Sequence, residues 1–516
     1  MNDETQGSRR ARRSTRNLLS FWLACLAVFL VAWSWRPQEL PTTAGGPAAG
    51  EAPAGSVGSP PSGAQAERAT LVEPASHTDS AAQTAAARTD ARQAGTAQAG
   101  AARAGTASSD RPACATAGSP PPSSSNRLLS RLFLDNEDSW LAMRAGLERI
   151  PHAADEPLYA GIFAQCIKFQ YPPSSLLLLD FASALFGPRV LQNAVLNGVS
   201  LLMLGLMLGA VWKIYTHLLP AGWGSWGQHA VPLLFTVTCY PVLKAVELGQ
   251  IQTWLNALFA VAVLLYCKDR RLAAGVLLGL IATIKPQLAL VLPWALLRRD
   301  WALAKGMAGC AAVIMTTSLL RYGLAPHLEY VGVVSALSRH GESYYANHSF
   351  NGLLLRALQL GTNVTFEADR FAPYHPLVHA GTTLSTLALV AFALLSRRAS
   401  HRELPALNLV LAGLCFTMAS PIAWEHHYGL VPVVFAVLVP LLLARKDVAP
   451  ALWAALGLSW ILIAARFSAT LALHDTGWNF LQSHVYFGAL LLLGVLHLAR
   501  REVGAPPPEP AGVLVR

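Results

Sequence analysis

Acidic side chains gather in the stretch from Leu134 to Pro173, and two of them are candidates for acid–base chemistry. Asp135 and Asp138 lie near its start, and Tyr171-Pro172-Pro173 ends it. A carboxylate in such a loop can take the proton from a hydroxyl group that attacks a substrate. Either side chain could instead cap a helix that starts near Ser139. The residues alone leave both carboxylates open as the base.

Other polar residues interrupt apolar runs further along the chain, where they are costly and are therefore functional hypotheses. Cations and hydrogen-bond donors at such places can hold a phosphate leaving group. We predict contacts to the phosphate or sugar of a lipid-linked donor from these side chains: Tyr171, Gln250, Lys285, Asn347, Ser349, Arg356, Trp424, Glu425, His426 and His427. There is a structural alternative for two of these residues. Lys285 could pair with a carbonyl group, and Arg356 could serve as an anchor for a helix at the membrane interface, without contacting the donor.

A metal site at the adjacent histidines is not expected. Neighbouring side chains on a helix point about 100° apart, and no third ligand is spaced to complete a site. We therefore predict neither a metal nor a cofactor. Seven cysteines show no zinc-ligand spacing, and most of them lie inside apolar runs. Cys114 and Cys166 are the exceptions, and they could form an extracytoplasmic disulfide.

The elements that must position these residues are membrane helices. The chain is 53% hydrophobic and 13% charged, whereas soluble domains carry about 25% charged residues. Many apolar runs reach the roughly 20 residues that a spanning helix needs. The net charge of +10 comes from clusters at the ends of apolar runs, which is typical of topology signals and not of nucleic-acid binding. We predict an all-α polytopic membrane protein.

The domain organisation follows from changes in composition. We expect a basic cytoplasmic tail at 1–17 and a first transmembrane anchor at 18–35. A low-complexity segment at 36–125 is expected to be a disordered extracytoplasmic insert. The membrane domain extends over 126–500, and a disordered cytoplasmic tail occupies 501–516.

Basic clusters set the expected topology of the membrane domain. Leu272 to Leu297 has basic residues at both ends, so we predict two short helices broken at Pro286. Ser174 to Phe186 is too short to cross and is expected to lie in the outer leaflet. Every basic cluster then lies in the cytoplasm, and the candidate site lies outside it. Full spans are expected near 190–212, 231–248, 250–267, 302–320, 375–396, 404–420, 429–444, 448–466 and 481–499.

An ordered set of motifs resembles a known family. The set is Tyr171-Pro172-Pro173, Gly249-Gln250, Ile284-Lys285-Pro286, residues 347–352 with Arg356, and residues 420–427. It resembles glycosyltransferase family 87, the polyprenol-phosphate-mannose-dependent α-1,2-mannosyltransferases of GT-C fold. The resemblance implies a bundle of about 10–13 transmembrane or half-membrane helices with a long first extracytoplasmic loop.

The resemblance also implies roles for individual residues. A loop aspartate acts as base in an inverting, metal-independent transfer, and Asp138 fits the family pattern better than Asp135. His426 or His427 would contact the donor, and Lys285 and Arg356 would support its phosphate. The chain departs from the pattern in two places, since His348 stands where the family often has Gln and Glu425 where it often has Asp.

We therefore predict a multi-pass glycosyltransferase of the plasma or inner membrane, with both termini cytoplasmic. It would move mannose or another hexose or pentose from a polyprenyl-phosphate donor to an extracytoplasmic glycan or glycolipid. A lipid-linked oligosaccharide ligase or polymerase is one alternative, although its large outer loop is expected late in the chain. A secondary transporter is another, although it should show matching interrupted segments in both halves.

Overall fold

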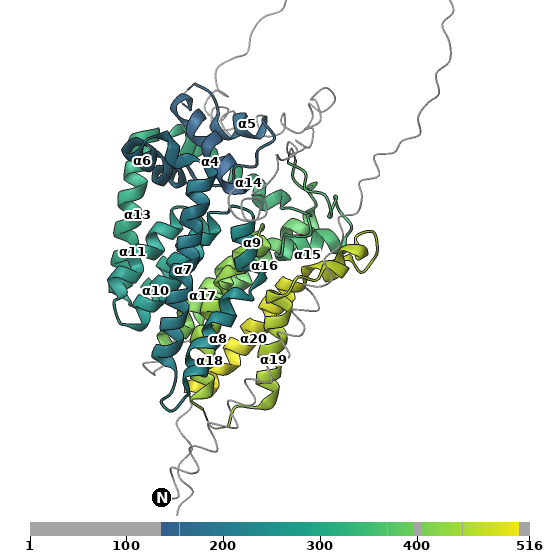
Figure 1. The fold of residues 1–516 in the computed structure, drawn as a ribbon. Helices are drawn as coiled ribbons and strands as arrows, with labels where there is room; N and C mark the ends of the chain where they lie inside the picture. The colour runs from purple at the N-terminus through teal and green to yellow at the C-terminus, as the bar shows by residue number, and fades with distance from the viewer. Residues whose placement is uncertain (1–135, 154, 369, 397–403, 446, 505–516) are drawn as a thin grey trace, which may run out of the picture. The chain divides into compact units, whose positions relative to one another are not determined.

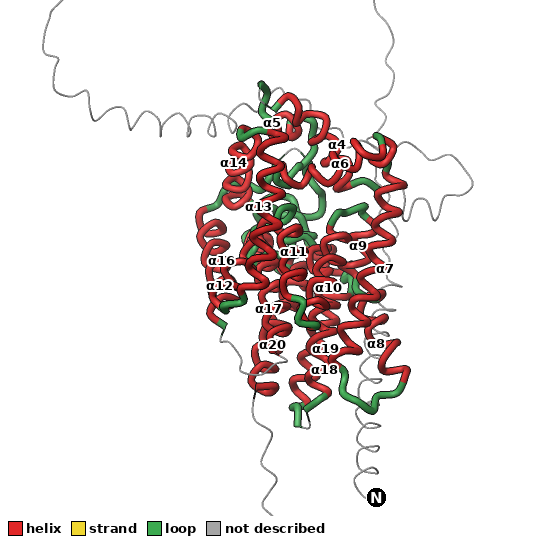
Figure 2. Tube along the Cα trace, turned by 90° about the vertical axis from the view of Figure 1, so that its left-hand side faces the viewer, coloured by secondary structure: helices red, strands yellow, loops and turns green. Residues whose placement is uncertain are grey.

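The computed structural model describes residues 136–153, 155–368, 370–396, 404–445 and 447–504. These residues form helices and connecting loops, without a β-strand among them (Figure 2). The expected tail, anchor and insert at 1–125 lie outside the described residues, as do Cys114 and Asp135. Cys166 is disulfide-bonded, and its partner also lies outside them.

Helices of three length classes make up the fold. The longer ones are α7 (Asn193–Leu218), α13 (Trp301–Tyr322), α16 (Pro376–Leu395) and α20 (His484–Gly504). Helices of intermediate length are α4 (Asp138–Arg149), α8 (Ser225–Val237), α10 (Gln252–Cys267), α11 (Arg271–Ala282), α14 (Ala325–His340), α17 (Leu404–Met418), α18 (Val431–Leu443) and α19 (Pro450–Ala464). The short ones are α5 (Leu158–Phe163), α6 (Leu177–Phe186), α9 (Tyr240–Glu247), α12 (Val291–Leu297) and α15 (Phe350–Ala357). The 3₁₀ turns used below are η2 (Pro173–Leu176), η4 (Pro286–Leu290), η5 (Glu425–Leu430) and η7 (Asn479–Ser483).

Several helices are long and apolar enough to cross a membrane, which confirms the all-α polytopic class. Five described segments pass by length and composition, namely Asn193–Leu218, Trp301–Tyr322, Pro376–Leu395, Glu425–Leu443 and Asn479–Arg501. Shorter apolar helices, such as α10, α17 and α19, occupy other expected spans.

The prediction of one continuous span at 231–248 is wrong in one respect, because the structure has two helices there that meet at a bend. Helices α8 and α9 meet at an angle of 53° and together form the sixth candidate span. Pro241 stands in the first turn of α9. A proline has no N–H to continue the hydrogen bonds of a preceding helix, so α8 cannot run on through this position.

The expected break at Pro286 is confirmed. Helix α11 ends at Ala282, and η4 begins at Pro286 and leads into α12. Arg271 at the start of α11 forms an ion pair with Asp300 just beyond α12, at 3.3 Å. The two halves therefore form a hairpin that returns to the end of the bundle from which it started.

Contacts between helix ends agree with the expectation that the basic clusters lie on one side of the membrane. Asp300 also accepts a hydrogen bond from Tyr266 of α10 at 2.8 Å. Arg298 donates to the carbonyl oxygens of Leu394 and Ser396 at the end of α16, at 3.2 and 2.7 Å. The basic ends of α10, α12 and α16 thus lie together at one end of the bundle.

The short helices α4, α5 and α6 gather with α14 at the other end (Figures 1 and 2). The expected half-membrane helix is α6, which exposes 75% of Leu185 and 73% of Phe186. Its ten residues reach only about 15 Å at 1.5 Å per residue, half of a hydrocarbon core. This end of the bundle carries the candidate site.

Candidate active site

Asp138 is the first residue of α4, and the turn between α9 and α10 holds it in place. Its backbone N–H donates to the carbonyl oxygen of Leu248 at 3.1 Å. Its carboxylate accepts a hydrogen bond from the side-chain amide of Gln250. The Asp138 side chain does not cap α4, because Glu137 occupies the N-cap position.

Gly249 explains why this turn can approach the loop so closely. Its φ is +65°, and a Cβ atom there would lie 2.3 Å from the carbonyl oxygen of Asn136. Glycine adopts this backbone conformation at little cost and has no side chain to collide. The Gly249-Gln250 pair therefore brings the turn against the loop and supplies the amide that contacts Asp138.

A small hydrogen-bond network surrounds the Asp138 carboxylate. Gln250 accepts from the hydroxyl group of Ser139 at 2.6 Å and from that of Tyr171 at 3.3 Å. The backbone N–H of Ile251 donates to the Ser139 hydroxyl group at 3.1 Å. Burial raises the pKa of the Asp138 carboxyl group above its ordinary value, and the Gln250 hydrogen bond and the charge of Lys244 oppose this effect. A carboxyl group with a raised pKa is a stronger base than an ordinary aspartate.

The remainder of α4 is fastened to α7. The indole N–H of Trp140 donates to Asn197 at 2.7 Å, and Asn197 in turn donates to the carbonyl oxygen of Asn136 at 2.7 Å. Arg144 forms an ion pair with Glu137. These contacts hold α4, and with it Asp138, in a fixed position relative to α7.

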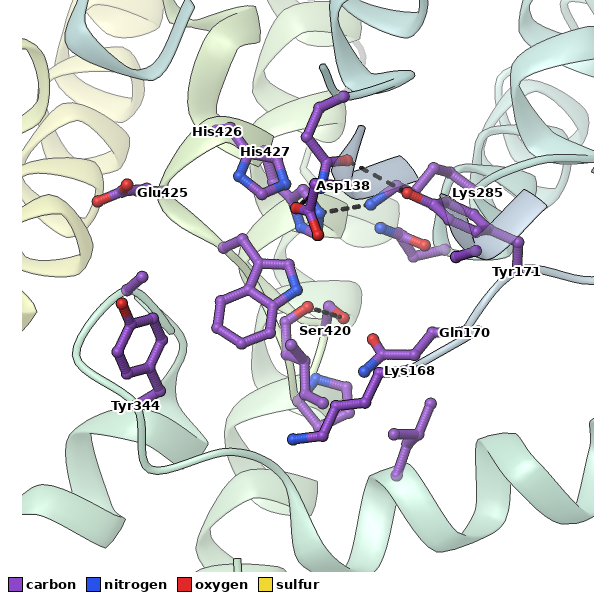
Figure 3. A pocket seen from close by; sticks show the side chains of 18 of the residues that line it. Asp138, Lys168, Gln170, Tyr171, Lys285, Tyr344, Ser420, Glu425, His426 and His427 are labelled. Carbon is purple, nitrogen blue, oxygen red and sulfur yellow. Dashed lines mark hydrogen bonds between the residues drawn. The ribbon is translucent and has the colours of Figure 1, made fainter. Parts of the chain in front are cut away.

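Lys285 and the two histidines form a second polar group near Asp138 (Figure 3). The Lys285 ammonium contacts Nε2 of His427 and lies 5.8 Å from the centre of the Tyr171 ring. Both ring nitrogens of His426 and Nδ1 of His427 are buried without a hydrogen-bond partner among the described residues. Buried polar atoms normally have partners. These atoms are therefore available to a ligand.

Eight of the predicted site residues line one cavity of about 760 Å³ (Figure 3). They come from α4, the α9–α10 turn, the break before η4 and the start of η5: Asp138, Tyr171, Gln250, Lys285, Trp424, Glu425, His426 and His427. The structure thus brings together residues that are almost 300 positions apart in the sequence. A volume of this size is typical of a small-molecule site.

Three predicted ligands do not line the cavity, because they hold its loops together. Asn347 accepts from the backbone N–H of Ala423 at 2.9 Å, and Ser349 donates to the carbonyl oxygen of Pro421 at 2.7 Å. Arg356 donates to the carbonyl oxygens of Tyr344 and Asn347 at 3.1 and 2.9 Å. These side chains join residues 342–349 to residues 420–424. Their contacts in the structure are therefore with the backbone of these loops, whereas the sequence predicted contacts with the donor.

The sequence prediction overlooked several residues that line the cavity. Lys168 forms a buried ion pair with Glu342 at 2.6 Å, and Lys244 forms an ion pair with the exposed Glu247 at 3.1 Å. Lys168 stands three positions before Tyr171, which was itself a predicted site residue, so its place in the sequence could have singled it out. Tyr344, Tyr345 and Phe366 also line the cavity, and Phe366 stands in a loop without periodicity that would single it out.

Two comparisons with known proteins match this chain. The sequence model of glycosyltransferase family 87 matches residues 169–421. A curated relative from Mycolicibacterium smegmatis is named a polyprenol-phosphate-mannose-dependent alpha-(1-2)-phosphatidylinositol mannoside mannosyltransferase. It is 27% identical over 345 residues, which are 62% of this chain and 73% of the relative. The helical membrane fold and the arrangement of the cavity agree with these matches, which together support placing the chain in glycosyltransferase family 87.

Proposed function

We propose that this membrane glycosyltransferase moves a sugar, mannose in the first instance, from a polyprenyl-phosphate donor to a glycan or glycolipid outside the cytoplasm. The observation that carries the proposal is the shared cavity, which the Asp138 carboxylate lines together with a lysine and two histidines (Figure 3). A base on one side and cations with hydrogen-bond donors on the other are what this transfer requires.

Asp138 takes the proton from the acceptor hydroxyl group in this reaction. The acceptor oxygen then attacks the anomeric carbon while the bond from that carbon to the phosphate oxygen breaks. A single displacement of this kind inverts the configuration at the anomeric carbon. The Gln250 amide keeps the carboxylate oriented toward the cavity.

Lys285 and His427 hold the leaving phosphate. An ammonium group beside a phosphate forms a charge-assisted hydrogen bond, which is about twice as strong as a neutral one. The unpartnered nitrogens of His426 and His427 supply further donors or acceptors. Because these groups stabilise the phosphate as it departs, the proposed transfer needs no metal ion.

The proposed orientation places the cavity on the extracytoplasmic side of the plasma membrane. The basic helix ends lie together at the end of the bundle away from α4, and basic segments favour the cytoplasmic side. Polyprenyl-phosphate sugars serve as donors outside the cytoplasm, where nucleotide sugars are absent. The relative named for this donor type gives mannose as the first sugar to test.

The decisive experiment measures sugar transfer in membranes from a radiolabelled polyprenyl-phosphate mannose. Asp138→Asn should lower the transfer rate by about 10²–10⁴-fold, the usual contribution of a general base. Asp180→Asn is the matched control, because Asp180 lies on α6 and pairs with Arg321 outside the cavity. Asp135→Asn tests the other carboxylate that the sequence left open.

Donor binding is measured on the same membranes, with all variants expressed at matched levels. Loss of transfer in Asp138→Asn alone, with donor binding retained, assigns the base. Normal transfer in that variant would show that the loop is not catalytic. The ligase and transporter alternatives would then have to be tested.

A further inference from the structure

Four aromatic rings form one wall of the cavity, away from Lys285. We call Tyr344, Tyr345, Phe366 and Trp424 the aromatic wall. The ring of Tyr344 lies 4.6 Å from Tyr345, 5.6 Å from Phe366 and 6.2 Å from Trp424, centre to centre. These rings are not sealed in the core, since 43% of Phe366 is exposed. The Lys168 ammonium lies over the Phe366 ring at 4.6 Å, and the exposed part of the aromatic wall is available to a ligand in the cavity.

The aromatic wall is held in place before any ligand arrives. The backbone N–H of Tyr345 donates to the carbonyl oxygen of Asn363 at 2.7 Å, which fixes the loop that carries Phe366. Trp424 pairs with Asn347 in an antiparallel β-bridge. Three segments distant in the sequence are thus locked into one surface. A preorganised surface loses little entropy when it binds a ligand.

A buried carboxylate stands beside the wall. Glu425 lines the cavity and accepts a hydrogen bond from the Tyr240 hydroxyl group at 3.0 Å. Lys244 and Arg466 are its nearby cations. Figure 3 shows Glu425 and Tyr344 on the opposite side of Asp138 from Lys285. The cavity therefore holds the rings and Glu425 on the side of Asp138 away from Lys285, and the cations of this side, Lys168 and Lys244, are paired with Glu342 and Glu247.

We propose that the aromatic wall with Glu425 is the acceptor subsite, and that it binds the uncharged pyranose ring that ends the acceptor. This inference rests on the proposed function. One face of a pyranose presents C–H groups that pack on the negative face of an aromatic ring. Its hydroxyl groups point outward from the ring edge, where a carboxylate can accept hydrogen bonds. The same carboxylate disfavours a phosphate or an acidic group in this position.

The position of the base agrees with this assignment. The donor phosphate occupies the side of Lys285 and His427, and the acceptor sugar occupies the other. Asp138 then stands next to the hydroxyl group that attacks. A flexible polyol or a simple alcohol could also bring a hydroxyl group next to Asp138, but it would not pack against the rings of the aromatic wall.

The test uses synthetic acceptors in detergent-solubilised full-length protein. The probes are octyl mannopyranoside, octyl glucopyranoside, octyl galactopyranoside and octylglycerol, and the last has hydroxyl groups but no ring. Transfer from polyprenyl-phosphate mannose is measured for each probe, and donor hydrolysis by water is measured without any probe. The variants are Phe366→Ala and Phe366→Leu, because leucine keeps bulk but lacks an aromatic face. The matched control is Tyr374→Ala, an exposed aromatic residue of the same loop that does not line the cavity.

At least one pyranoside should be a better acceptor than octylglycerol. Both Phe366 variants should raise the KM for that pyranoside by about five- to tenfold, as expected for one lost ring contact. Their kcat and their KM for the donor should stay within about twofold of wild type, and Tyr374→Ala should change neither KM. An unchanged acceptor KM in both Phe366 variants would overturn the proposal, as would better transfer to octylglycerol. Wild-type protein that hydrolyses the donor but accepts no pyranoside would overturn the acceptor subsite alone. Wild-type protein that neither hydrolyses nor transfers from the donor would overturn the proposed function as well.

Discussion

Replacing Gly249 by alanine should disable the enzyme without touching the cavity. The added Cβ atom would lie 2.3 Å from the carbonyl oxygen of Asn136 and 2.7 Å from its carbonyl carbon. Both atoms belong to the backbone two residues before Asp138, so no side chain can rotate out of the way. The loop itself must move.

The size of the movement sets the expected loss of activity. Carbon and oxygen atoms in ordinary contact lie about 3.5 Å apart, so the loop must retreat by roughly 1 Å. A catalytic group misplaced by about 1 Å costs on the order of 10²-fold in rate. We therefore expect kcat for sugar transfer to fall by about 10²-fold in Gly249→Ala. Donor KM should change little, because Lys285 and the histidines stand on other elements.

A matched control separates this collision from backbone strain. Gly187 has a φ of +83°, and a Cβ atom there would meet nothing within 4 Å. Alanine at either position is strained, because both backbones have a positive φ. The ψ of 166° at Gly187 lies in a region that is almost exclusive to glycine, so the strain there is at least as large as in the left-handed region. Gly187→Ala should therefore lose some thermal stability and keep its transfer rate, whereas Gly249→Ala should lose both.

The assay is transfer from a radiolabelled polyprenyl-phosphate sugar in membranes, with thermal stability measured on solubilised protein. A Gly249→Ala variant with a wild-type transfer rate would refute the reasoning, since the turn would then not position the base. Equal losses of rate in the two variants would show that strain, and not the collision with Asn136, is responsible.

Two further predictions concern the base and the loops around it. Because burial raises the pKa of Asp138 above its ordinary value of 3.8 and the Gln250 hydrogen bond opposes this, kcat should fall on acidification through a pKa above the ordinary one. Gln250→Leu should move this acid limb to higher pH; a kcat–pH profile with its limb at or below 3.8 would contradict the assignment. Arg356→Met removes donors to three carbonyl oxygens and to the Ser483 hydroxyl group, so it should cost roughly 2–4 kcal/mol of stability, as lost charged hydrogen bonds do. A thermal-melting curve unchanged from wild type, together with a higher donor KM, would restore the predicted phosphate contact.

The sequence predicted the membrane elements well where local chemistry decides them. Apolar length predicts a helix that crosses, and a proline between two basic clusters predicts the break before η4. The bend at Pro241 was missed, because a proline in the first turn of a helix is also compatible with a helix that simply starts there. Its effect depends on the direction of α8, which is a tertiary property.

The residues that line the cavity were predicted in part. The predicted residues that do not line it were selected for one physical reason. Asp138, Lys285 and His427 were found because ionisable groups beside apolar runs are costly and conspicuous. Asn347 and Arg356 carry the same signal, yet they satisfy backbone carbonyl groups of nearby loops. Residue type and spacing do not reveal whether a buried polar group faces a ligand or the chain itself. That distinction depends on the pairing of loops some 75 residues apart.

The bend between α8 and α9 has a consequence for the site that neither helix shows alone. Tyr240 at the start of α9 holds Glu425, and Leu248 directly after α9 holds the backbone of Asp138. Eight residues at 1.5 Å each make α9 about 12 Å long, so this helix sets how far apart the acceptor-side carboxylate and the base can lie. Pro241 starts α9 in a direction different from α8, and the two ends of α9 thus contact the two acidic residues of the cavity, Glu425 and Asp138.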